Sequence, residues 1–146
     1  MTPPSIHFTT YSSSVEETLA LAAELVQSIQ GRGIISLEGP LGAGKTHFVK
    51  GIAAALEIKE EVTSPTFTLL HSYGANEKRL HHLDFYRLKE EAEAIDLGLE
   101  DYFSESLTII EWGNKFPLLL PPETIRVIIK PRENEVREIS YILPHS

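Results

Sequence analysis

The chain has 146 residues, of which 42% are hydrophobic and 23% charged, the balance of a folded globular protein rather than of a disordered tail. Acidic residues outnumber basic ones 21 to 13, and the resulting net charge of −8 argues against a protein that wraps nucleic acid by itself. The lack of cysteine excludes disulfides, thiolate metal sites and cysteine nucleophiles, and the lack of a signal sequence or of about 18 consecutive apolar residues predicts a cytoplasmic protein outside the membrane.

The first half of the chain predicts strands that alternate with helices. A short strand is expected at Ile6–Thr9, followed by serines that can cap a helix. The spacing of the apolar residues puts one face of this helix at Val15, Leu19, Ala22, Val26 and Ile29. Gly31 and Gly33 end the helix, and the apolar run Ile34–Leu37 predicts a buried strand. A second helix is expected after residue 44, with Phe48, Ile52 and Ala55 facing inward.

The second half of the chain predicts two hairpins around a central strand. A polar helix is expected at Lys89–Asp96, broken at Gly98, and the central strand at Leu107–Ile110. The hairpins pair Phe67–Tyr73 with Arg79–Phe85, and Thr124–Lys130 with Glu135–Ile142. These elements predict one α/β domain over residues 1–146, with a mixed sheet between two helical layers and a hairpin at the C-terminal end.

A glycine-rich segment between the second strand and the second helix carries the strongest functional signal. Residues Gly39–Thr46 fit the phosphate-binding P-loop pattern G-x-x-x-x-G-K-[ST] at every fixed position. The glycines let backbone N–H groups turn toward phosphate oxygens, and the helix that follows adds its own free N–H groups. Lys45 would reach the β- and γ-phosphates, and the Thr46 hydroxyl would bind Mg²⁺. The alternative, a turn that binds nothing, fits less well because pattern and context agree.

Two carboxylates follow strand-like runs and are candidates for the metal and for the attacking water. Glu111 follows the more apolar run and is the first choice as metal ligand, while Asp84 would place the water. For either residue alone, a solvated strand end or a helix cap is the alternative. His81 and His82 resemble a metal pair, but adjacent strand residues point to opposite faces, so we expect His82 to be a network residue.

Four motifs occur in this chain, and together their order and spacing are specific for one protein family. They are Gly39–Thr46, Ser64–Leu69 (Ser-Pro-Thr-Phe-Thr-Leu), His82–Arg87 (His-Leu-Asp-Phe-Tyr-Arg) and Glu111-Trp112. The set resembles the TsaE family, the small bacterial P-loop ATPases of tRNA threonylcarbamoyladenosine biosynthesis, over nearly the whole chain, from about Ser12 to Tyr141. The resemblance implies a three-layer fold like that of P-loop NTPases.

The resemblance also implies an activity and partners. Members of the family bind ATP and Mg²⁺ and hydrolyse ATP slowly, mostly when bound to the partner proteins TsaB and TsaD. Those partners transfer the threonylcarbamoyl group to the adenosine beside the anticodon, and ATP hydrolysis resets the complex between turnovers. Because a chain of charge −8 is repelled by tRNA, we expect it to reach tRNA only indirectly, through these proteins.

The resemblance assigns roles to single residues. Lys45, Thr66, Asp84 and Glu111 match catalytic positions, with Thr66 as a switch near the γ-phosphate, and Thr46 and Glu111 match the metal ligands. The nucleotide contacts it implies are Val15 on the adenine side, Gly39, Leu41, Gly42, Ala43, Gly44, Lys45, Thr46, His47 and Arg137. Two positions depart from the family pattern, Pro40 in place of Asp and His47 in place of a second Thr. The second departure leaves the backbone N–H of His47 available but puts a hydroxyl contact to the α-phosphate in doubt.

Two other functions remain open from the sequence. A small-molecule P-loop kinase would need a lid with several arginines and an acceptor pocket, and no lid-like insertion is visible. A nucleotide-sensing adaptor would bind ATP without turning it over. Phosphate release with and without partner proteins separates the three functions, which are the ATPase, the kinase and the adaptor.

Overall fold

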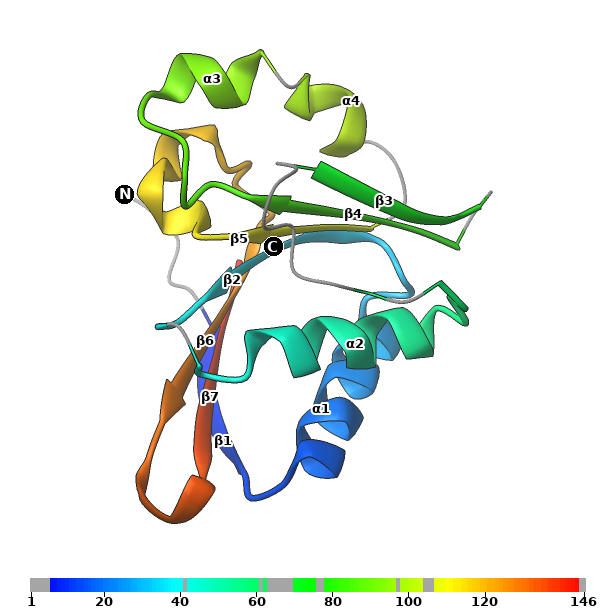
Figure 1. Ribbon diagram of the computed structural model, residues 1–146, viewed down its shortest axis with the longest axis vertical. Coiled ribbons are helices and arrows are strands. Elements are labelled where there is room, and N and C mark those ends of the chain that lie inside the picture. Colours follow the sequence, from blue (N-terminus) through cyan, green and yellow to red (C-terminus); the bar gives the residue numbers. More distant parts are fainter. Residues whose placement is uncertain are drawn as a thin grey trace.

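The strands of the chain form one mixed sheet in the order β1-β7-β6-β2-β5-β4-β3 (Figure 1). The computed structural model describes residues 6–40, 42–60, 62, 70–75, 78–96, 98–103 and 107–144. The strands are β1 Ile6–Ser12, β2 Gly33–Glu38, β3 Leu70–Ala75, β4 Lys78–Asp84, β5 Leu107–Glu111, β6 Ile125–Pro131 and β7 Arg137–Leu143. The four inner strands β6, β2, β5 and β4 run parallel, and β1, β7 and β3 are antiparallel to their neighbours.

Helices cover both faces of this sheet (Figure 1). On one face lie α1 (Val15–Ser28) and α2 (Lys45–Ala55). On the other lie α3 (Glu91–Ile95), α4 (Leu99–Phe103) and the 3-10 turns η1 (Gly113–Lys115) and η2 (Pro117–Leu119). A third turn, η3 (Glu133–Glu135), connects β6 to β7. The three layers, the mixed sheet and the C-terminal hairpin confirm the predicted fold class.

Several predicted details are wrong. The buried face of α1 consists of Thr18, Ala22, Leu25 and Val26, whereas Val15 is 44% exposed. The reason is that the first turn of α1 lines a groove instead of packing on the sheet. The predicted helix 89–96 is limited to α3, and α4 was not predicted, because two five-residue helices are too short to show a periodic apolar pattern.

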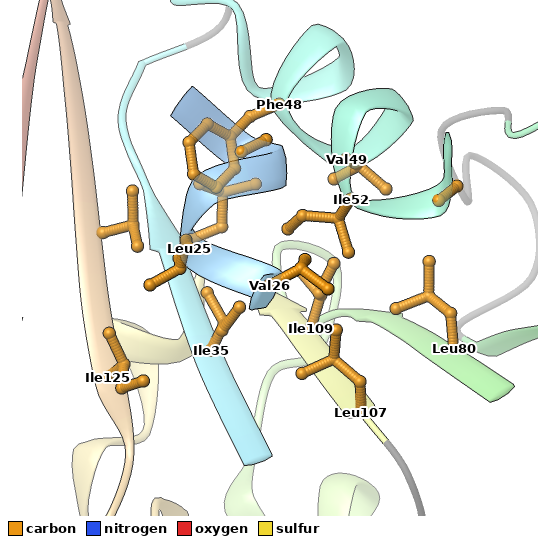
Figure 2. Packing of buried hydrophobic residues seen from close by; sticks show 14 of the residues in the cluster. Leu25, Val26, Ile35, Phe48, Val49, Ile52, Leu80, Leu107, Ile109 and Ile125 are labelled. Carbon is orange, nitrogen blue, oxygen red and sulfur yellow. The ribbon is translucent and has the colours of Figure 1, made fainter. Parts of the chain in front are cut away.

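The larger core cluster fixes α2 on the sheet. Phe48, Val49 and Ile52 project from α2 toward Ile35 of β2 and Ile109 of β5, and all five are fully buried (Figure 2). Burial of each such side chain contributes about 1.5–3 kcal/mol. The position of the first residue of α2, Lys45, relative to the ends of β2 and β5 is therefore determined by apolar packing. No helix in the described part of the chain has the length and apolar character needed to cross a membrane.

The two helices of this layer approach closely at a glycine. A Cβ atom on Gly51 of α2 would lie 2.8 Å from the Cβ of Ala22 and 2.8 Å from the carbonyl oxygen of Leu19, both on α1. Real Cβ atoms essentially never come so close to such atoms, so any side chain at residue 51 forces the helices apart. Gly51 therefore sets how closely α2 packs on α1.

We predict that Gly51→Ala destabilises the protein. In an unconstrained helix this change would stabilise by about 0.5–1 kcal/mol, but overpacking here should lower the free energy of unfolding by about 1–3 kcal/mol. Urea denaturation of wild type and variant measures the difference. Ala54→Gly, at an exposed position of the same helix, calibrates the propensity effect alone. A Gly51→Ala variant more stable than wild type would contradict the close approach.

Candidate functional site

The glycine-rich loop connects the end of β2 to the start of α2, as its sequence pattern predicts. Gly39, Gly42 and Gly44 have φ angles of 150°, 80° and 102°. A Cβ on Gly39 would lie 2.4 Å from the carbonyl oxygen of Ile129 on β6, so only glycine fits there. Gly44, in the left-handed conformation, is the N-cap of α2. The backbone thus favours glycine at Gly39 and Gly44, the two fixed glycines of the motif.

A bidentate ion pair holds the strand end that precedes the loop. The Arg126 guanidinium on β6 donates from Nε to Glu38 Oε2 and from Nη2 to Glu38 Oε1, each at 2.8 Å. The Ser36 hydroxyl also donates to Glu38 Oε2, at 3.2 Å. Glu38 is buried and directly precedes Gly39, so these bonds fix the start of the loop to the neighbouring strand.

Strand register brings the predicted carboxylates together. In the parallel pairing of β4 with β5, Asp84 lies opposite Glu111 and His82 opposite Ile109. Because side chains alternate along a strand, His82, Asp84 and Glu111 share the face that carries Ile109 and α2. Lys45 of α2 reaches this cluster, with Nζ 3.9 Å from Glu111 Oε1. Both of these side chains are buried.

The two adjacent histidines point to different surroundings, as predicted for neighbours on a strand. His82 Nε2 lies 2.6 Å from Glu111 Oε2 in the cluster. His81 Nδ1 lies 2.8 Å from the Ser72 hydroxyl, and its ring packs on Tyr102 of α4 with centroids 4.9 Å apart. The two rings therefore do not face a common ion in this structure.

Two aromatic residues line the cluster that we call the Lys45 cluster (Lys45, His82, Asp84 and Glu111). Trp112 follows β5 directly and has a φ of 60°, uncommon for a bulky residue. This conformation places its ring under the Lys45 ammonium, with Nζ 4.6 Å from the ring centroid. Tyr86 packs on Trp112 with centroids 5.0 Å apart. Such a cation–π contact contributes about 0.5–2 kcal/mol, which helps to offset the burial of Lys45.

Burial dominates the electrostatics of the cluster. It lowers the pKa of Lys45, and the nearby carboxylates of Glu111 and Asp84 oppose that shift. It also raises the pKa of Asp84, an effect that Glu111 reinforces. The backbone N–H of Tyr86 donates to Asp84 Oδ1 at 2.8 Å and opposes the rise. The site therefore holds charged groups with less water than they have on an open surface.

Two cavities that share lining residues lie next to each other at this end of the sheet, and we refer to them together as the groove. The first has a volume of about 280 Å³ and is lined by Gly42, Gly44, Lys45, Thr46, His47, Asp84, Tyr86, Glu111, Trp112 and Arg137. The second, of about 250 Å³, is lined by Ser13, Ser14, Val15, Thr18, Gly44, His47, Glu135 and Arg137. Gly44, His47 and Arg137 line both, so the groove runs from the Lys45 cluster to the start of α1.

Most predicted site residues that the structure describes lie along this groove. Gly42, Gly44, Lys45, Thr46, His47, Asp84, Glu111 and Arg137 line the first cavity, and Val15 lines the second. Gly39 and Ala43 line neither; Ala43 is fully buried, and its N–H donates to the Pro40 carbonyl at 3.1 Å. Leu41 and Thr66 lie outside the described residues.

Several residues that line the groove were not predicted from the sequence. In the sequence, Trp112 and Tyr86 stand only within the motifs Glu111-Trp112 and His82–Arg87, which give neither side chain a place beside Lys45. Glu135 reaches the groove because it and Asn134 both adopt positive φ. Alternation along β4 is a usable signal for His82, since it lies two residues before Asp84 on the same face. Nothing in the sequence indicates Glu135.

A family model, curated relatives and a solved structure all match this chain over most of its length. The family model described as "Threonylcarbamoyl adenosine biosynthesis protein TsaE" matches residues 12–139. The tRNA threonylcarbamoyladenosine biosynthesis protein TsaE of Bacillus subtilis is 39% identical over 127 residues, 86% of this chain and 79% of the relative. That of Treponema pallidum is 35% identical over 88% of this chain and 96% of the relative. The crystal structure of Bacillus subtilis YdiB superposes with a TM-score of 0.79 at 29% identity, covering 99% of this chain and 90% of that one.

We predict that Asp84→Asn stabilises the nucleotide-free protein at pH 7. Because the pKa of Asp84 is raised on folding, its ionised form destabilises the folded state above that pKa, and the effect vanishes below about pH 4, where folded and unfolded chains are both protonated. Asparagine keeps the acceptor for the Tyr86 N–H without the charge. The Tm of the variant should exceed that of the wild type at pH 7, and the difference should disappear as the pH falls below about 4.

Thermal unfolding of both proteins across this pH range checks the prediction. Glu123→Gln, which removes a carboxylate from an exposed position, serves as the control and should leave the pH dependence unchanged. A loss of stability in Asp84→Asn at pH 7 would show that attraction to Lys45 outweighs burial.

Proposed function

This chain belongs to the TsaE family and acts in tRNA threonylcarbamoyladenosine biosynthesis, and we propose that it does so as a Mg²⁺-dependent ATPase that works through partner proteins. Its P-loop fold implies nucleotide binding. One observation carries the proposal of ATP hydrolysis: Lys45, Asp84 and Glu111, from three separate elements, converge beside the N-terminus of α2. A phosphate-binding cation and two carboxylates at one point are the parts that such a reaction needs.

The loop and α2 would bind the phosphates. The N-terminus of α2 presents backbone N–H groups and the positive end of the helix dipole, and Lys45 adds a full positive charge. Arg137 lies beside the loop, since a Cβ on Gly44 would be 3.5 Å from its Nε. These groups supply the positive charge for a triphosphate in a chain that is negative overall.

The donor atoms of the groove fit Mg²⁺. The Thr46 hydroxyl and the Glu111 carboxylate are the hard oxygen ligands that this ion prefers, and both residues line the first cavity. The described ranges contain no group of three or more histidines and carboxylates that could hold a metal ion by themselves. Mg²⁺ does not need such a group, because proteins commonly bind it through one or two carboxylates together with phosphate oxygens. When bound, the ion would neutralise charge on the phosphates.

Asp84 and Thr66 are proposed to act on the attacking water. Asp84 lies opposite Glu111 on the neighbouring strand, and the Tyr86 N–H fixes one of its oxygens, so its other oxygen can accept a bond from water. Thr66, outside the described residues, is assigned only by resemblance, as a hydroxyl that senses the γ-phosphate. Orienting the water in this way lowers the barrier to hydrolysis.

The second cavity is proposed to hold the adenosine. It lies on the far side of Gly44, His47 and Arg137 from the Lys45 cluster, as expected for a nucleotide that crosses the loop. Val15 offers an apolar contact for the base, and the backbone N–H of His47 is proposed to contact the α-phosphate. This arrangement supports the nucleotide contacts that the resemblance implies.

We propose TsaB- and TsaD-like proteins as the partners, in the cytoplasm where tRNA is modified. Participation in this pathway implies partner proteins, and the family resemblance suggests these two. The net charge of −8 supports indirect contact with tRNA, because like charges repel. Hydrolysis would then reset the complex between turnovers.

Phosphate release tests the proposal. ATP and Mg²⁺ are incubated with the chain alone, with purified TsaB and TsaD, and with the partners alone. We expect the chain alone to release phosphate slowly. The partners should increase this rate, without any added acceptor. Phosphate release without an acceptor excludes a strict kinase, because a kinase transfers the phosphoryl group to its acceptor instead of releasing it. ADP formation that requires a metabolite acceptor would favour a kinase, and a lack of ADP formation even with partners would favour an adaptor.

We predict that Lys45→Ala weakens ATP binding at least tenfold. The ammonium makes charge-assisted hydrogen bonds to phosphate, each of about 1.5–3 kcal/mol. Isothermal titration calorimetry measures the change. Lys50→Ala, at an exposed position of the same helix, is the matched control and should bind as wild type does. Unchanged affinity in Lys45→Ala would contradict the assignment of the loop.

We predict different effects for the two carboxylates. Glu111→Ala should weaken Mg²⁺-dependent ATP binding and abolish turnover, because it removes a metal ligand. Asp84→Ala should keep most of the ATP affinity and lose turnover, because an interaction made mainly in the transition state lowers kcat with little effect on ground-state binding. ATP titrations with and without Mg²⁺, together with partner-stimulated turnover, separate the two roles. Loss of Mg²⁺ dependence in Asp84→Ala but not in Glu111→Ala would show that the roles are reversed.

A further inference from the structure

The contact between His82 and Glu111 is buried within the Lys45 cluster. His82 is 1% exposed and Glu111 5% exposed. The distance of 2.6 Å between His82 Nε2 and Glu111 Oε2 indicates a strong hydrogen bond, because one partner is a carboxylate. No step proposed above uses His82, so its place in the cluster needs its own explanation.

The chemistry of the two groups determines the direction of this bond. A carboxylate accepts, so Nε2 must carry the proton. The other ring nitrogen, Nδ1, is buried and has no hydrogen-bond partner among the described residues. The geometry therefore directs the Nε2–H of His82 at Glu111.

The bond leaves Glu111 with one oxygen directed toward the rest of the site. Oε2 is bound to His82, whereas Oε1 is the oxygen nearest to Lys45, at 3.9 Å. Without His82, the carboxylate could rotate about its last side-chain bond and pair more closely with Lys45. A metal ligand that pairs with a lysine is less available to an ion, so the orientation of Glu111 matters for binding.

We infer that His82 is a positioning residue that holds Glu111 so that Oε1 is presented to the magnesium ion. This inference rests on the proposed function, since it concerns the same ion. Groups that bond to metal ligands fix the orientation of those ligands, and their loss typically weakens metal affinity about 10–100-fold. His82 belongs to the binding site through Glu111 and does not itself contact the nucleotide or the ion.

A pair of substitutions separates positioning from packing. Glutamine carries its amide NH₂ one methylene further from the backbone than asparagine does, close to the reach of a histidine Nε2. His82→Gln can therefore keep the bond to Glu111, while His82→Asn, with the same functional group, is too short. His81→Asn is the control on the same strand, because His81 is equally buried but bonds to Ser72, away from Glu111.

Mg²⁺ is expected to strengthen ATP binding. The first readout is the Mg²⁺ concentration at which this effect is half complete. We expect His82→Asn to raise it at least tenfold, and His82→Gln and His81→Asn to stay within about threefold of wild type. In His82→Asn, affinity for ATP without Mg²⁺ should change less than the half-saturating Mg²⁺ concentration does. Saturating Mg²⁺ should restore ATP affinity in His82→Asn, which a packing defect would not allow.

The second readout needs neither nucleotide nor metal. Nitrogen-15 NMR of the imidazole in the free protein should show a proton on His82 Nε2, and Glu111→Gln should shift the Nε2 resonance. This measurement tests the bond between His82 and Glu111 even if His82→Asn fails to fold. A spectrum without a proton on Nε2, or one that is insensitive to Glu111→Gln, would overturn the inference.

The outcomes distinguish the inference from the proposed function. If wild type binds ATP more tightly with Mg²⁺ but His82→Asn and His82→Gln behave alike, the inference fails and the proposed function stands. If Mg²⁺ has no effect on ATP binding by the wild type, the proposed function fails and the inference fails with it.

Discussion

The burial of one ammonium group beside two carboxylates, at the ends of the parallel inner strands, is the constraint on which the site depends. Lys45 and Glu111 are nearly inaccessible to water, and burial of such charges is unfavourable unless each finds a partner. Glu111 has two partners, Lys45 and His82, and Lys45 also lies over the ring of Trp112. The three side chains of Lys45, Asp84 and Glu111 carry a net charge of −1 when ionised. Such a cluster attracts a divalent cation, and a cation makes it compatible with a triphosphate.

The rest of the fold serves to place these groups. Apolar packing of α2 on β2 and β5 positions Lys45, and the parallel register of β4 and β5 brings Asp84 opposite Glu111. The bond between Glu38 and Arg126 and the close approach of Gly39 to Ile129 fix the loop to β6. Each constraint acts on a strand end or a helix start. These contacts bring the described site residues together, although they come from widely separated parts of the sequence.

The sequence predicted those features that depend on local pattern. The P-loop, the strand-end carboxylates and both hairpins follow from glycine spacing, apolar runs and turn residues. It did not predict the exposure of Val15, because an apolar residue at a helix start can equally line a groove. It also could not show that Trp112 lies under Lys45, because this depends on a left-handed backbone conformation at a non-glycine residue. Three-dimensional register, absent from any local pattern, was needed to join His82 to Glu111.

A crystal structure of the protein with Mg²⁺ and a non-hydrolysable ATP analogue tests the central claim most directly. We expect the terminal phosphates beside the Lys45 ammonium, the ion bound by the Thr46 hydroxyl and by the Glu111 oxygen that does not bond to His82, and the adenosine near Val15. A nucleotide bound elsewhere on the chain, or an ion held by Asp84 with Glu111 still paired to Lys45, would contradict the account.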